Sequence, residues 1–98
     1  MKQRNIFLLG SKQEYALMKK WANKDRKYHL NGWFHDKDIP SNPENLIDEY
    51  NNLIGDNLVD HFVLDPSDMD PMMLQASLDW AESQGSRIHM IQSGTDTL

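Results

Sequence analysis

The residues best placed to do chemistry lie in the turn after the first apolar run. Residues 5–9 are mostly apolar and end on Gly10, and Ser11-Lys12 opens a helical pattern. This order is typical of the first turn of dinucleotide-binding α/β domains, where backbone N–H groups hold a diphosphate. Gly10, Ser11 and Lys12 are therefore candidate cofactor-binding residues. Asp36 follows at nearly the distance at which an acid binds ribose hydroxyls.

The same turn carries a competing signal. Lys12 and Tyr15 occupy the positions where a dinucleotide turn has its second and third glycines. Ser11 and Glu14 form the S-x-x-E pattern of a capping box, which satisfies the first helical N–H groups internally. Glu14 also adds negative charge where a phosphate would lie. These features favour structural capping over nucleotide binding.

Acidic side chains follow the second and third predicted strands. They are Asp36, Asp38, Asp65, Asp68 and Asp70. Carboxylates at this edge of an open sheet could bind Mg²⁺ or Ca²⁺. The alternative is that Asp70 caps a helix, Asp65-Pro66 forms a turn and the others are solvated loop residues. We favour this alternative and predict no metal site.

Asp65 also resembles the phosphoacceptor of receiver domains, which end a central strand on aspartate. The resemblance is partial because Gly10-Ser11 stands where an acidic pair should follow the first strand, and no lysine follows Lys37.

The histidines give no catalytic pattern. His29, His35, His61 and His89 are scattered, and their spacing forms neither an H-x-x-x-H pair nor a Ser/His/Asp set. Each is interpreted as a structural polar residue. No catalytic residue is predicted.

Four strands and three helices must position these residues. Apolar runs predict strands at about 5–9, 28–35, 59–64 and 87–91. A helix is expected over about 12–23, with Leu17, Met18 and Trp21 as its inner stripe. Asn42-Pro43 and Asp70-Pro71 predict the starts of two further helices, which end at Gly55 and Gly85.

The predicted fold is a small Rossmann-like α/β/α domain. The order β-α-β-α-β-α-β implies a four-stranded parallel sheet with helices on both faces. We expect this domain over residues 1–92 and a frayed tail over 93–98. Because four strands make a small sheet, it is expected to be part of a longer polypeptide or to bury an edge in a homo-oligomer.

Charge is unevenly distributed along the 98 residues. Nine of the ten basic residues and three acids lie within residues 1–37, whereas one basic residue and twelve acids follow. The basic part could face an anionic partner such as a membrane, or it could be an ordinary solvated surface. Nucleic acid is not expected, because the basic residues are not interleaved with stacking aromatics.

The chain has no cysteine, no signal peptide and no apolar run of the about 18 residues that span a membrane.

Three segments resemble a known family. The run from Asn5 to Gly10, the segment Leu30-Asn31-Gly32-Trp33-Phe34-His35-Asp36 and the segment Val59-Asp60-His61-Phe62-Val63-Leu64 are similar to the amino-terminal, CoA-binding-like domain of bacterial polyprenyl-phosphate glycosyl-1-phosphate transferases. These enzymes initiate exopolysaccharide and capsule assembly. Arg87-Ile88-His89-Met90-Ile91 resembles the closing strand of that domain.

The resemblance implies a regulatory or assembly role without catalysis by this chain. It implies the catalytic and transmembrane parts of a parent transferase as partners, and a place at the cytoplasmic face of the bacterial inner membrane. It also implies weak sensing of a nucleotide or UDP-sugar. The alternatives are a functional module for NAD, CoA or a UDP-sugar, as in related nucleotide-sugar dehydratases, and a receiver-like switch at Asp65.

Overall fold

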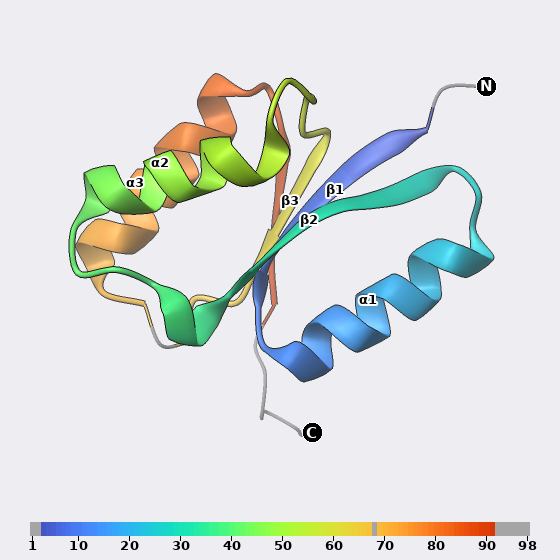
Figure 1. The fold of residues 1–98 in the computed structure, drawn as a ribbon, viewed down its shortest axis with the longest axis horizontal. Helices are drawn as coiled ribbons and strands as arrows, with labels where there is room; N and C mark the ends of the chain where they lie inside the picture. Colours follow the sequence, from blue (N-terminus) through green and yellow to red (C-terminus); the bar gives the residue numbers. More distant parts are fainter. Residues whose placement is uncertain (1–2, 68, 92–98) are drawn as a thin grey trace.

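The predicted α/β fold is confirmed. A computed structural model describes residues 3–67 and 69–91, so the predicted tail, residue 92 and Asp68 lie outside the described residues. The elements are β1 (Arg4–Gly10), α1 (Lys12–Lys24), β2 (Tyr28–His35), the 3-10 turn η1 (Asp36–Asp38), α2 (Pro43–Ile54), β3 (His61–Leu64), α3 (Pro71–Ser83) and β4 (Arg87–Met90). Figure 1 shows helices on both sides of the sheet.

The four strands are parallel and lie in the order β2-β1-β3-β4. This is the flavodoxin-like order, whereas the first half of a Rossmann fold places its third strand beside the second. Strand order reverses between β1 and β3, and ligands of doubly wound sheets bind at the carboxyl end of such a point. Gly10 of β1 and Leu64 of β3 end their strands there.

Local side chains define the helix ends as predicted. The Asn42 side chain accepts a hydrogen bond from the Glu44 N–H at 2.8 Å, and Pro43 begins α2. Asp70 does the same for the Met72 N–H at the start of α3. Gly55 and Gly85 follow these helices with φ angles of 59° and 72°, which side-chain-bearing residues rarely adopt.

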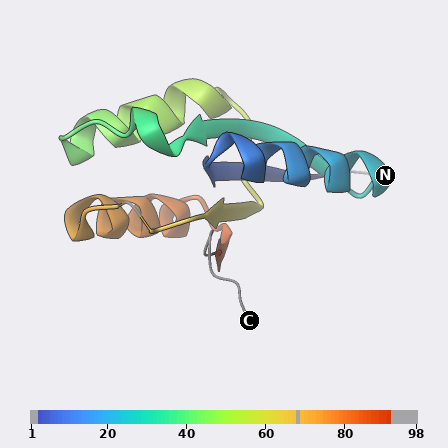
Figure 2. The same cartoon turned by 90° about the horizontal axis from the view of Figure 1, so that it is seen from below.

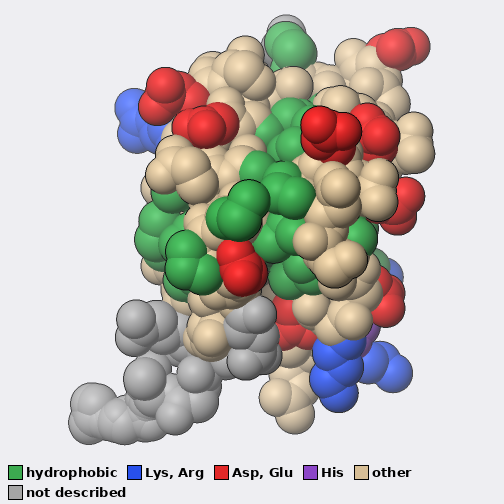
Figure 3. Space-filling view, turned by 90° about the vertical axis from the view of Figure 1, so that its left-hand side faces the viewer, with side chains coloured by type: hydrophobic (Ala, Val, Ile, Leu, Met, Phe, Trp, Pro, Cys, Tyr) green, Lys and Arg blue, Asp and Glu red, His purple; other side chains and the backbone are tan. Residues whose placement is uncertain are grey.

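The larger core lies between the sheet and the pair α2 and α3. Its aromatic rings contact one another at centroid distances between 4.8 and 5.7 Å. They belong to Phe7, Phe34, Tyr50, Phe62 and Trp80. Figure 3 looks onto this side of the molecule, where acidic side chains surround an apolar strip.

The smaller core lies under α1, on the other face of the sheet. Ile6, Leu8 and Val63 are its buried residues. The predicted inner stripe of α1 is wrong in part, because Leu17 is 70% exposed and Trp21 is 46% exposed. The reason is that α1 lies along β1 and β2, so that within residues 3–67 and 69–91 no helix packs against its side toward β3 (Figure 2).

Strand β2 contains an irregularity that the sequence did not reveal. Ile6 pairs with Leu30 but Phe7 pairs with Gly32, so Asn31 is an extra residue in the ladder. Leu30 and Trp33 therefore both face α1 despite their odd spacing. Strand β3 is also shorter than predicted, since it begins at His61 rather than Val59.

Candidate functional site

The first turn is closed by its own side chains. The Ser11 Oγ accepts a hydrogen bond from the Glu14 N–H at 3.1 Å, and the Glu14 Oε1 accepts one from the Ser11 N–H at 2.7 Å. This is the predicted capping box. The carbonyl of Gly10 is also occupied, because the Trp33 indole donates to it at 3.0 Å.

Gly10 makes room for a carboxylate of the chain itself. A Cβ atom at this position would lie 2.6 Å from the Glu14 Oε1. In a dinucleotide turn the small residue instead lets the backbone approach a diphosphate. The space that a phosphate would use is therefore occupied by Glu14.

Glu14 lies beside a second acid at the switch point. Burial raises the pKa of the Glu14 carboxyl, the hydrogen bond from the Ser11 backbone lowers it, and Asp65 raises it again by hydrogen bonding and charge. Asp65 itself is 3% exposed and accepts a hydrogen bond from the Ser67 N–H at 3.0 Å. Two neighbouring carboxyl groups at this point oppose the binding of an anion.

The structure brings the predicted site residues to one edge of the sheet. Gly10 pairs with His35, so Asp36 immediately follows its partner. Ser11 is half-buried as the N-cap of α1, whereas Lys12 is exposed. All four candidates thus lie at one edge of the sheet, and the polar groups of Gly10 and Ser11 are bonded to the chain itself.

Asp36 differs from the other candidates in that its Oδ1 lacks a donor. This atom is buried and has no hydrogen-bond partner among the described residues. The His35 Nδ1 lies 3.1 Å away, but that nitrogen accepts a hydrogen bond from the Lys37 N–H. A lone pair used in this way cannot also hold a proton for Asp36. The two groups therefore form a close contact rather than an ion pair in this arrangement.

The structure gives little support to a phosphoacceptor at Asp65 or to a metal site at the acidic edge of the sheet. A phosphoacceptor needs an accessible carboxylate, whereas Asp65 is buried and turned toward Ser67. No group of three or more potential metal ligands occurs among residues 3–67 and 69–91. The predicted turn and capping roles of Asp65 and Asp70 are both confirmed.

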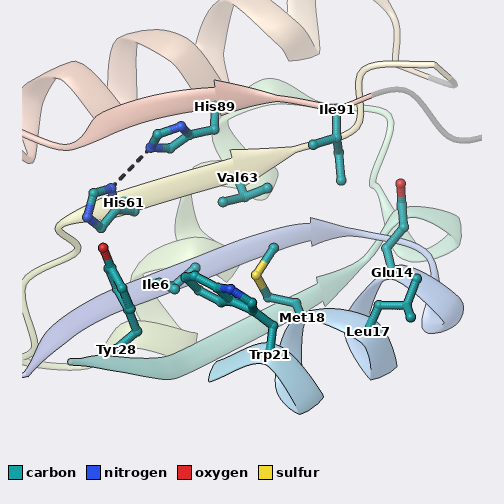
Figure 4. Close-up of a pocket in the computed structure, with 10 residues that line it drawn as sticks. All are labelled: Ile6, Glu14, Leu17, Met18, Trp21, Tyr28, His61, Val63, His89 and Ile91. Atoms are coloured by element: carbon teal, nitrogen blue, oxygen red, sulfur yellow. Dashed lines mark hydrogen bonds between the residues drawn. The ribbon is translucent and has the colours of Figure 1, made fainter. Parts of the chain in front are cut away.

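A second candidate site is an apolar groove beside α1, which we call the α1 groove. It encloses about 450 Å³ over β1, β3 and β4. Figure 4 shows Glu14 and Ile91 at one end and Tyr28 and His61 at the other. The lining residues are Ile6, Glu14, Leu17, Met18, Trp21, Tyr28, His61, Val63, His89 and Ile91.

The groove contains a histidine pair that sequence spacing missed. The His61 Nδ1 and the His89 Nε2 lie 3.1 Å apart, so one nitrogen donates and the other accepts (Figure 4). Burial lowers the pKa of His61, and the charges of His89, Arg4 and Arg87 lower it further. The sequence did contain one signal for this pair. Side chains two residues apart in a strand share a face, so His61 faces the same side as Val63, and His89 faces the same side as Ile91 in the adjacent strand.

Comparison with known protein families, with curated proteins and with solved structures found no match for the chain. Within the described residues, no helix has the length and apolar character needed to cross a membrane.

Proposed function

We propose that this chain is a non-catalytic Rossmann-like domain that regulates or helps to assemble a membrane sugar-phosphate transferase. The observation that carries the non-catalytic part is the closed first turn, in which Ser11 and Glu14 satisfy each other's backbone N–H groups. An anion site at a helix start needs those groups free. The fold is therefore used as a scaffold, and its partner is a protein.

The transferase class rests on the resemblance of three segments, which lie in β1, in β2 up to Asp36, and across β3 with the two residues before it. Gly32, the glycine of the resembling segment in β2, has a structural role. A Cβ on Gly32 would lie 2.7 Å from the Phe7 ring, so this position keeps the first two strands packed on the larger core.

Reconstitution tests the proposal. The purified chain is added to a polyprenyl-phosphate glycosyl-1-phosphate transferase whose own amino-terminal domain has been removed, and phosphosugar transfer to polyprenyl phosphate is measured. The chain alone should transfer nothing, and its addition should change substrate affinity by about fivefold or more, the usual size of coupling between sites. Transfer by the chain alone, or an unchanged transferase, would refute the proposal.

Titration with NAD, CoA and UDP-glucose tests the rival role as a nucleotide-binding module. Amide chemical shifts of Gly10, Ser11, Lys12 and Asp36 should stay unchanged at millimolar ligand. Saturable shifts confined to these residues would favour the rival instead.

A further inference from the structure

The α1 groove is the place of a missing layer. A helix is about 10 Å wide and strands lie about 4.8 Å apart, so one helix covers about two strands. On the opposite face, α2 and α3 together cover the sheet. On this face α1 covers β1 and β2, and the half above β3 and β4 lacks a helix within the described residues.

The uncovered half has the surface of a packing layer rather than of a solvated one. Ile6 and Val63 lie on its floor, and Leu17 and Trp21 form one wall from α1 (Figure 4). Large apolar side chains on a concave surface of this kind mark an interaction site. The uncovered half of the sheet is two strands wide, which corresponds to one helix.

Charge at the two ends of the groove gives the occupant a direction. Arg4 and Arg87 lie close enough to His61 to lower its pKa, and Asp60 opposes them with one charge. Lys24 adds a cation because it follows Trp21 by three residues on the same helical face. Glu14 lies at the other end (Figure 4). A helix lying parallel to α1 would place its negative carboxyl end near the cations and its positive amino end near Glu14.

We infer that the α1 groove binds one amphipathic helix of a partner, with an apolar stripe toward Leu17 and Trp21 and acidic residues toward Arg4 and Arg87. Helix α1, which forms one wall of the groove, has 13 residues and is about 20 Å long, so a helix that lies along it has about 13 to 15 residues. The three α-helices of the described residues already have their places in the fold, so the proposed helix is supplied by the partner.

This inference deepens the proposed assembly role by describing the partner segment. The test is selection of binders from a displayed library of random 15-residue peptides against the whole chain. Enriched peptides should repeat apolar residues at helical spacing and carry acidic residues in their carboxyl half, and they should become helical on binding.

Two matched variants locate the binding site. Leu17→Glu changes a groove residue that is 70% exposed, and Met72→Glu changes a residue of α3 that is 68% exposed. Both should keep the fold, because neither side chain is buried. Leu17→Glu should weaken peptide binding by about tenfold or more through lost apolar burial, and Met72→Glu should leave it unchanged.

A second pair of variants tests the charge. Arg87→Gln should weaken the selected peptides, and Lys37→Gln should not, since Lys37 is exposed in η1 and outside the groove. Added salt should reduce the effect of Arg87→Gln.

Several results would overturn the inference. They are a lack of enriched helical peptides, peptides that bind the Leu17→Glu chain equally well, and groove-dependent binding to phosphatidylglycerol vesicles or to a second copy in place of peptide. The proposed function is judged separately by reconstitution. A chain that binds helices without changing a transferase would fail there and succeed here.

Discussion

At the scale of single residues, Glu14 combines a structural and an electrostatic role. Its carboxylate accepts the Ser11 N–H and lies beside Asp65. Because folding raises its pKa above the ordinary 4.5, the folded state binds more protons than the unfolded chain above that pH. The contribution of Glu14 to the free energy of unfolding therefore falls as the pH rises from 4.5 through the higher folded value.

The variants Glu14→Gln and Glu14→Ala separate these two roles. Glutamine keeps an acceptor for the Ser11 N–H but removes the charge, so Glu14→Gln should be at least as stable as the native chain at pH 7. Glu14→Ala should be less stable than Glu14→Gln by about 1 kcal/mol, the usual net value of one hydrogen bond. Urea unfolding at pH 4.5 and pH 7 measures both. Equal stability of the two variants would argue against the capping hydrogen bond.

His61 makes the α1 groove sensitive to acid. Burial and nearby cations lower its pKa below the ordinary 6.5. Its contribution to stability is therefore complete above pH 6.5 and is lost as the pH falls toward the lower folded value. An NMR titration should place the His61 midpoint below 6.5, and Arg4→Gln should move it upward because one like charge is gone. An unshifted midpoint in the native chain would contradict this account.

At the scale of elements, the irregularity of β2 decides which side chains face the core. A Cβ on Gly32 would lie 2.7 and 2.9 Å from two carbons of the Phe7 ring. Phe7 is fully buried among other rings and cannot move freely. Gly32→Ala should therefore destabilise the chain by about 1–3 kcal/mol, as overpacking usually does. Ala16→Ser serves as the control, because Ala16 lies on the exposed side of α1. Gly85→Ala is unsuitable as a control, because Gly85 has a positive φ that alanine rarely adopts. An unchanged midpoint in Gly32→Ala would show that β2 can shift.

The starts of α2 and α3 could be predicted from local signals, whereas the α1 groove could not. Asn42-Pro43 and Asp70-Pro71 act within one turn, so their capping could be predicted from sequence. The exposure of Leu17 could not, because helical spacing does not reveal which strands lie beneath α1. The His61–His89 contact joins residues of two strands and depends on their register. The Glu14–Asp65 contact depends on the strand order in the same way.

At the scale of the whole molecule, the two faces of the sheet contribute unequally to stability. Leu46 of α2 is fully buried in the larger core, whereas Leu17 of α1 is largely exposed. Leu46→Ala should therefore cost about 2–5 kcal/mol, as expected for a deleted core leucine. Leu17→Ala should change the free energy of unfolding by no more than about 0.5 kcal/mol. Chemical denaturation of both variants checks this, and similar losses would mean that Leu17 belongs to the core.

Strand β4 forms one border of the sheet. It has four residues, all of them exposed, and among the described residues it pairs with β3 alone. Open strand borders invite stacking between molecules, and brevity is one way in which proteins blunt that tendency. An incoming strand would find only a few amide partners here. A designed variant with a longer β4 would therefore offer more unpaired backbone groups to the strands of other molecules. Such a variant should aggregate and precipitate from concentrated solution.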